Sequence, residues 1–302
     1  MSSYLLAVSV ALLGWWVSTG IILYLNLLPS RSHAWSVGGF AVFALASLAA
    51  LPYVAEQHSQ AAAIAGFAIA LAVWGALEIS YLMGFLTGNN SQPCPASVSG
   101  WRRFRLAVAT SIHHEIAVIA CGIAIVVLSW GATNQVAAGT YLTLWLMRWS
   151  AKLNLYLGVS NFNEHWLPER NRYLVSYMRT RAMNWLFPFS VGLATIAAVL
   201  LALAASGADN AVDKLSFALV CTLLSLAILE HWFLVLPVRD SALWQWAITA
   251  AGRVRARTTQ RTTARVPPAK KMAITANNPA TTTSGQTMRS SFFTRLKADS
   301  SP

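Results

Sequence analysis

The apolar residues of this chain occur in blocks of about 20, separated by short stretches of polar and turn-forming residues. An α-helix of that length crosses the hydrocarbon core of a bilayer. Of all residues, 56% are hydrophobic and only 11% are charged, whereas a soluble domain carries about 25% charged residues. We therefore predict an all-α fold, specifically a polytopic membrane helix bundle of about seven transmembrane helices.

The arginines alternate between successive connections. The predicted spans cover approximately residues 4–28, 35–55, 62–87, 104–130, 136–158, 184–205 and 213–236. Basic residues gather after the first, third and fifth spans (Arg31; Arg102, Arg103 and Arg105; Arg170, Arg172, Arg179 and Arg181), and Lys214 is the exception on the other side. Because positive charge stays in the cytoplasm during insertion, we predict an outer N-terminus and a cytoplasmic C-terminus.

The segments outside the spans are polar and basic. We expect residues 1–246 to form the helical bundle, with a cytoplasmic loop at residues 159–183. Residues 247–302 contain few large apolar residues and many basic ones, which predicts a disordered cytoplasmic tail that binds anionic lipid. The net charge of +12 lies mainly in loops and tail, so we do not predict nucleic acid as a partner.

The three cysteines, Cys94, Cys121 and Cys221, form no CxxC motif, and two of them lie inside apolar blocks. They predict neither a disulfide framework nor a zinc site.

Ionisable and polar side chains interrupt several spans. An ionisable residue in hydrocarbon costs roughly 2.5 to 3.5 kcal/mol on insertion scales, so each requires a partner or a purpose. Their depths along the helices predict one polar layer in the cytoplasmic half of the bilayer. The residues are Glu78, His113, His114, Glu115, Arg148, Lys152, Asn154, Glu230 and His231.

This layer has three interpretations that the sequence leaves open. Arg148, Lys152 and Asn154 can belong to a self-neutralising polar network with the acids. A transition metal is the second interpretation, with ligands from Glu78, His113, His114, Glu115, Glu230 and His231, although the Glu-x-x-His spacing of carboxylate-bridged bundles is missing. A pigment or haem is the third, with one imidazole as axial ligand. A transporter pathway is the weakest alternative, because no inverted repeat or pair of broken helices is visible.

Five stretches together resemble one family. They are residues 15–20 (WWVSTG), 101–105 (WRRFR), 113–115 (HHE), 147–161 (MRWSAKLNLYLGVSN) and 229–237 (LEHWFLVLP). The chain resembles PuhE, the photosynthetic complex assembly protein family of anoxygenic phototrophic bacteria. The resemblance extends from about residue 4 to about residue 246 and leaves the basic tail outside.

The resemblance implies a multi-pass protein of the bacterial inner (intracytoplasmic) membrane, with a periplasmic N-terminus. It implies an assembly factor for the photosynthetic reaction centre and core light-harvesting complex, which contacts their subunits or other assembly factors and influences bacteriochlorophyll supply. His114 and His231 are the candidate bacteriochlorophyll ligands, and no catalytic residue is implied. The alternative is a metal-dependent membrane enzyme of bacteriochlorophyll metabolism that uses the His/Glu cluster.

Overall fold

The computed structural model describes residues 2–161, 169–238 and 240–265, which form helices and no β-strand. The long helices form where the apolar blocks predict them, because these blocks are rich in Ala and Leu and contain few prolines. The α-helices are α1 (Ser3–Asn26), α2 (His33–Ala55), α3 (Gln60–Leu82), α4 (Gly100–Ala109), α5 (Ile112–Leu128), α6 (Val136–Leu157), α7 (Leu186–Gly207), α8 (Ala211–Phe233) and α9 (Gln245–Arg265). Short 3₁₀ helices are η1 (Ser30–Ser32), η3 (Glu169–Tyr177) and η4 (Asp240–Trp244).

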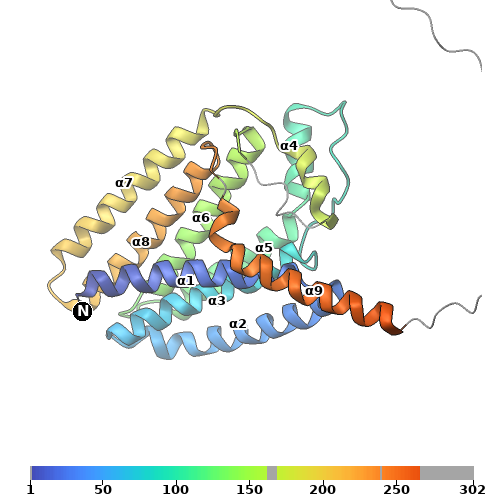
Figure 1. The fold of residues 1–302 in the computed structure, drawn as a ribbon. Helices are drawn as coiled ribbons and strands as arrows, with labels where there is room; N and C mark the ends of the chain where they lie inside the picture. Colours follow the sequence, from blue (N-terminus) through green and yellow to red (C-terminus); the bar gives the residue numbers. More distant parts are fainter. Residues whose placement is uncertain (1, 162–168, 239, 266–302) are drawn as a thin grey trace, which may run out of the picture.

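Helix α3 occupies the centre of the bundle. In its most apolar stretch 67% of the residues are buried, against 33% or less in α1, α2, α7 and α8. It packs against α2, α6 and α1, while α7 and α8 pair with each other beside α1 and α6 (Figure 1). Because the outer helices turn apolar side chains such as Leu193 and Leu45 outward, at 71% and 66% exposed, the bundle suits a multi-pass membrane protein.

The helices support a smaller number of apolar spans than seven. Five of them, α1, α2, α3, α7 and α8, are long and apolar enough to cross a membrane within the described residues. A sixth span results if α4 and α5 are counted together, although they are bent by 65° at residues 110–111. Helix α6 occupies the predicted fifth span but is less apolar, since it contains Arg148, Lys152 and Asn154. The count of seven and the orientation therefore remain predictions.

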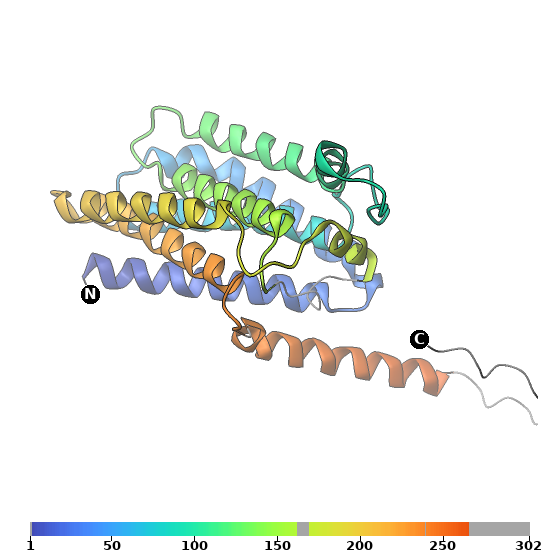
Figure 2. The ribbon, with the colours of Figure 1, turned by 90° about the horizontal axis from the view of Figure 1, so that it is seen from above.

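The region after Trp246 is helical at first, contrary to the prediction of disorder from residue 247. Helix α9 extends to Arg265 and lies along the second half of α1 before it leaves the bundle (Figures 1 and 2). A β-carbon on Gly20 would lie 2.2 Å from Cζ2 of Trp246, so a glycine is required for this close approach. Trp16 and Trp244 each donate an indole hydrogen bond to the opposite segment, at 2.9 and 3.0 Å. This tertiary packing holds a helix that composition alone does not predict; residues 266–302 lie outside the described residues.

The described parts of loop 159–183 cover the ends of two helices. The side-chain amide of Asn161 donates to the carbonyls of Phe233, Leu236 and Val238, just past the end of α8. Arg170 and Asn171 donate to carbonyls of Met83 and Leu82 at the end of α3. The loop thus satisfies carbonyls that a helix terminus leaves free. His165 and Trp166 lie outside the described residues.

Candidate functional site

Helix α6 carries polar side chains on two opposite faces. Arg148 and Lys152 are four residues apart and share one face, as do Ser150 and Asn154. A shift of two residues rotates a helical position by about 200°, so the two pairs point away from each other. The first pair turns toward α3 and α5, and the second toward α7 and α8.

Arg148 binds Glu78 of α3 through two parallel hydrogen bonds. Its Nε donates to Oε1 at 3.1 Å and its Nη2 donates to Oε2 at 2.9 Å. The side chain of Glu78 is 11% exposed and that of Arg148 is 33% exposed. This two-bond geometry is the strongest form of an arginine–carboxylate pair, and it connects the central helix to α6.

Lys152 binds Glu115 of α5, one turn further along α6. The indole of Trp149 donates to the other oxygen of Glu115 at 2.6 Å, and the hydroxyl of Ser111 donates to Oε1 at 3.4 Å. The ammonium group of Lys152 also lies 5.0 Å from the ring centre of Tyr81. A carboxylate with three donors is well satisfied, which allows its burial.

His114 lies between these two ion pairs and is 1% exposed. Its Nε2 is 3.8 Å from Oε1 of Glu78, beyond hydrogen-bonding distance, and its ring packs 4.7 Å from that of Tyr81. Its Nδ1 has no hydrogen-bond partner among the described residues. We call this set the charged cluster; it comprises Glu78, Tyr81, His114, Glu115, Arg148, Trp149 and Lys152.

The opposite face of α6 forms a neutral cluster, which comprises Ser150, Asn154, Asn184, Ser190 and His231. His231 uses both ring nitrogens. Nδ1 lies 2.9 Å from the carbonyl of Ala227, which can only accept, so Nδ1 carries a proton. Nε2 lies 2.9 Å from the Ser150 hydroxyl oxygen, from which a neutral ring accepts a hydrogen bond. The ring thus joins α8 to α6.

Asn154 and Asn184 complete the neutral cluster. The Asn184 amide donates to the backbone carbonyl and to Oδ1 of Asn154 and to the carbonyl of Gly158. Its own Oδ1 accepts from the backbone N–H groups of Leu186 and Phe187, at the first turn of α7. Asn184 thus caps α7 and fastens its start to the end of α6.

The structure separates the remaining predicted site residues from these clusters. His113 is exposed on α5, although its neighbours His114 and Glu115 are buried. Glu230 is exposed on α8 and accepts a hydrogen bond of 2.7 Å from the indole of Trp15, near the middle of α1. The nine polar residues do not meet in one cluster, because adjacent helical residues diverge by about 100° and face different neighbours. Their common depth in the bilayer stays a prediction.

The six candidate metal ligands do not form one group; they are Glu78, His113, His114, Glu115, Glu230 and His231. Within the described ranges, no group of three or more His, Cys, Asp or Glu side chains is placed to hold a metal ion. Glu78 and Glu115 are instead directed at Arg148 and Lys152. Arg148 and Lys152 belong to the charged cluster, whereas Asn154, predicted in the same network, belongs to the neutral one.

Sequence reasoning missed several members of both clusters. Ser150, Asn184 and Ser190 are neutral and small, and nothing in their local sequence distinguishes them from helix-surface residues. The four-residue spacing of Ser150 and Asn154 could have indicated a second polar face on α6. The sequence does not distinguish Trp149 from the other tryptophans, because only the fold shows which indole donates a hydrogen bond to a carboxylate.

Comparison with known proteins identifies the family. Residues 1–255 match the family model described as "Protein of unknown function (DUF3623)". A relative from Rhodobacter capsulatus, named as an uncharacterized 30.4 kDa protein in the puhA 5′ region, is 37% identical over 238 residues, which cover 78% of this chain and 87% of the relative. No solved structure matches the chain. The match over most of its length shows that this chain is a member of the DUF3623 family.

Proposed function

We propose that this chain is a membrane-embedded assembly factor for the bacterial photosynthetic reaction centre and core light-harvesting complex. The support from comparison is the relative encoded in the puhA 5′ region of Rhodobacter capsulatus. The five stretches that resemble the PuhE assembly family point in the same direction. The finer role, in subunit assembly or in bacteriochlorophyll supply, is part of the proposal.

The observation that carries the proposal is that the five stretches consist largely of residues that connect helices. Residues 147–161 supply both faces of α6, and residues 113–115 and 229–237 supply their partners on α5 and α8. Residues 15–20 receive α9, and Arg103 of residues 101–105 donates to the carbonyl of Tyr177. These side chains are occupied in binding one another. Such an arrangement favours a structural role, as a scaffold for other subunits, over a catalytic role.

The structure sets a geometric requirement for pigment binding by His114 or His231. His231 can ligate a bacteriochlorophyll magnesium through Nε2 only after Ser150 releases that nitrogen. The free Nδ1 of His114 lies in a side chain that is 1% exposed. A role for either histidine as a pigment ligand therefore requires the helices around it to separate.

The test is deletion of the relative's gene in Rhodobacter capsulatus, followed by expression of this chain. We expect the near-infrared bands of the reaction centre and core antenna to decrease in the membranes and to recover with the wild-type chain. Recovery should fail with Arg148→Gln, which removes the bond between α6 and α3, and persist with Arg31→Gln, since Arg31 is exposed in η1. Unchanged bands after deletion would reject the proposal.

Two further measurements separate assembly from its alternatives. If pigment supply is affected, pigment precursors accumulate and the purified chain carries a tetrapyrrole spectrum. If subunit assembly is affected, free bacteriochlorophyll is present while reaction-centre subunits are degraded. A stoichiometric transition metal in the purified protein, with activity lost on its removal, would replace the proposal with the enzyme alternative.

A further inference from the structure

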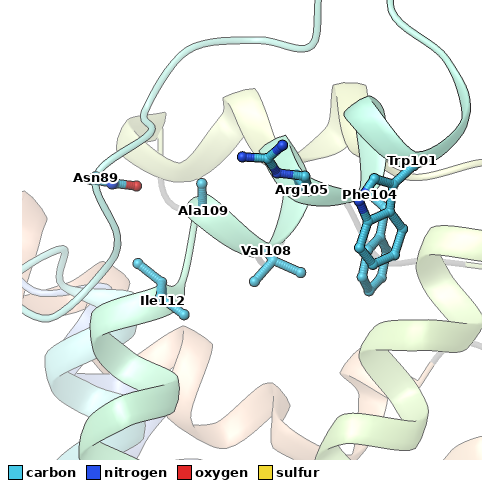
Figure 3. A pocket seen from close by; sticks show the side chains of 7 residues that line it. All are labelled: Asn89, Trp101, Phe104, Arg105, Val108, Ala109 and Ile112. Carbon is cyan, nitrogen blue, oxygen red and sulfur yellow. The ribbon is translucent and has the colours of Figure 1, made fainter.

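A cavity of about 370 Å³ lies where α4 turns away from α5. Figure 3 shows Asn89 at one end of it and the stacked rings of Trp101 and Phe104 at the other, with Arg105 above and Val108 and Ile112 below. The 65° bend between α4 and α5 opens this space, because the chain leaves the line of α5 at residues 110–111. The cavity thus combines a polar edge, an aromatic end and an apolar floor.

The polar edge of the cavity carries positive charge. Residues 88–111 contain Arg102, Arg103 and Arg105 and no Asp or Glu. Arg103 is buried, and it binds the carbonyl of Tyr177 and packs 4.5 Å from the ring of Tyr156. Arg105 is exposed and, within the described residues, it has neither a hydrogen bond nor an ion pair. A guanidinium with no partner among the described residues, in a cavity that Asn89 also lines, suits a phosphate group.

The apolar floor continues along the outside of α5. Ile112, Ile116, Ile119 and Ile123 are spaced by four, three and four residues, so they lie on one face of the helix. Ile116 and Ile123 are 56% and 60% exposed. A ligand whose phosphate lies at Arg105 can therefore extend an apolar chain along this face, which a soluble phosphate compound cannot use.

We propose that this cavity binds one anionic phospholipid. Its phosphate contacts Arg105 and Asn89, its glycerol lies against Trp101 and Phe104, and an acyl chain follows Val108 and Ile112 down α5. The site differs from the basic tail, because it selects a lipid by a shaped cavity rather than by diffuse charge. It is independent of the proposed assembly function.

The experiment compares lipid binding by the full chain in mild detergent. Phosphatidylglycerol and phosphatidylcholine are added separately, and retained lipid is counted by native mass spectrometry. We expect wild-type protein to retain phosphatidylglycerol preferentially and Arg105→Gln to bind it about tenfold more weakly, the loss typical of one charged contact. Arg102→Gln is the matched control, since Arg102 is exposed on the same helix but does not line the cavity.

A second variant tests the cavity without changing its charge. Val108 is 38% exposed, and Val108→Trp should fill the space, keep Arg105 and still lose the lipid. As an independent readout, brominated phosphatidylglycerol should quench less fluorescence in Trp101→Phe than in wild type. Equal losses in the Arg102 and Arg105 variants, equal retention of both lipids, or displacement of the lipid by inorganic phosphate at the same concentration would each overturn the proposal.

Discussion

The two faces of α6 bind neighbouring helices through different kinds of polar contact. Toward α3 and α5 the helix presents Arg148 and Lys152, each paired with a carboxylate, whereas toward α7 and α8 it presents Ser150 and Asn154 in neutral hydrogen bonds. Both faces join helices through polar groups away from water. The difference is in what happens when one partner is lost, because an unpaired charge costs more than an unpaired amide or hydroxyl.

The largest expected effect is at the Glu78–Arg148 pair. Arg148→Met should lower the free energy of unfolding in detergent by about 3 kcal/mol, the low end for a broken buried pair, because the arginine is one-third exposed. Adding Glu78→Leu, which is also measured as a single variant, to Arg148→Met should recover most of this loss. Thermal unfolding of the two single variants and the double variant measures it; strictly additive losses would show that the pair does not hold α3 to α6.

A smaller loss is expected at the second ion pair of the same face. Lys152→Met should cost about 2 kcal/mol, since Glu115 keeps its hydrogen bonds from Trp149 and Ser111. Trp149→Phe in the Lys152→Met background should increase the loss by removing another donor. The same unfolding assay tests whether Arg148→Met loses more stability than Lys152→Met. A Lys152 variant less stable than the Arg148 variant would contradict this ranking.

On the neutral face we expect the largest effect at Asn184. Asn184→Leu should cost about 1 to 2 kcal/mol, because it removes a helix cap and three donated bonds. Asn184→Ser should lose less, since its hydroxyl can still accept from the first turn of α7. Hydrogen exchange at Leu186 and Phe187 reports the cap directly; unchanged protection in the Leu variant would show that the cap is unimportant.

The smallest effect should come from Ser150→Ala, about 1 kcal/mol, because it removes the hydrogen bond to His231 Nε2 and only a long one of 3.4 Å from the Asn154 amide. Ser216→Ala is a suitable control, as Ser216 donates to Val212 within its own helix. The comparison of the two serine variants by thermal unfolding isolates the contact between helices. If both variants lose the same stability, the Ser150–His231 bond contributes nothing beyond local helix effects.

Much of the fold was predictable, while much of the site was not. Apolar block length predicted the long helices of the bundle, but not the break between α4 and α5 at residues 110–111, which lies inside the predicted fourth span. Helix α9 was missed because its stability comes from contacts of Trp244 and Trp246 with α1, and such long-range packing leaves no periodic signal.

Composition and hydropathy alone show that this chain is rich in bilayer-length apolar segments, and that a few of them carry charged and polar residues. Tertiary structure decided which of those residues meet. Of three successive residues, His113 points outward, His114 turns to Tyr81 and Glu78, and Glu115 turns to Lys152. The physical reason is rotation: each step along a helix turns the side chain by about 100°, and only the positions of neighbouring helices determine what it faces.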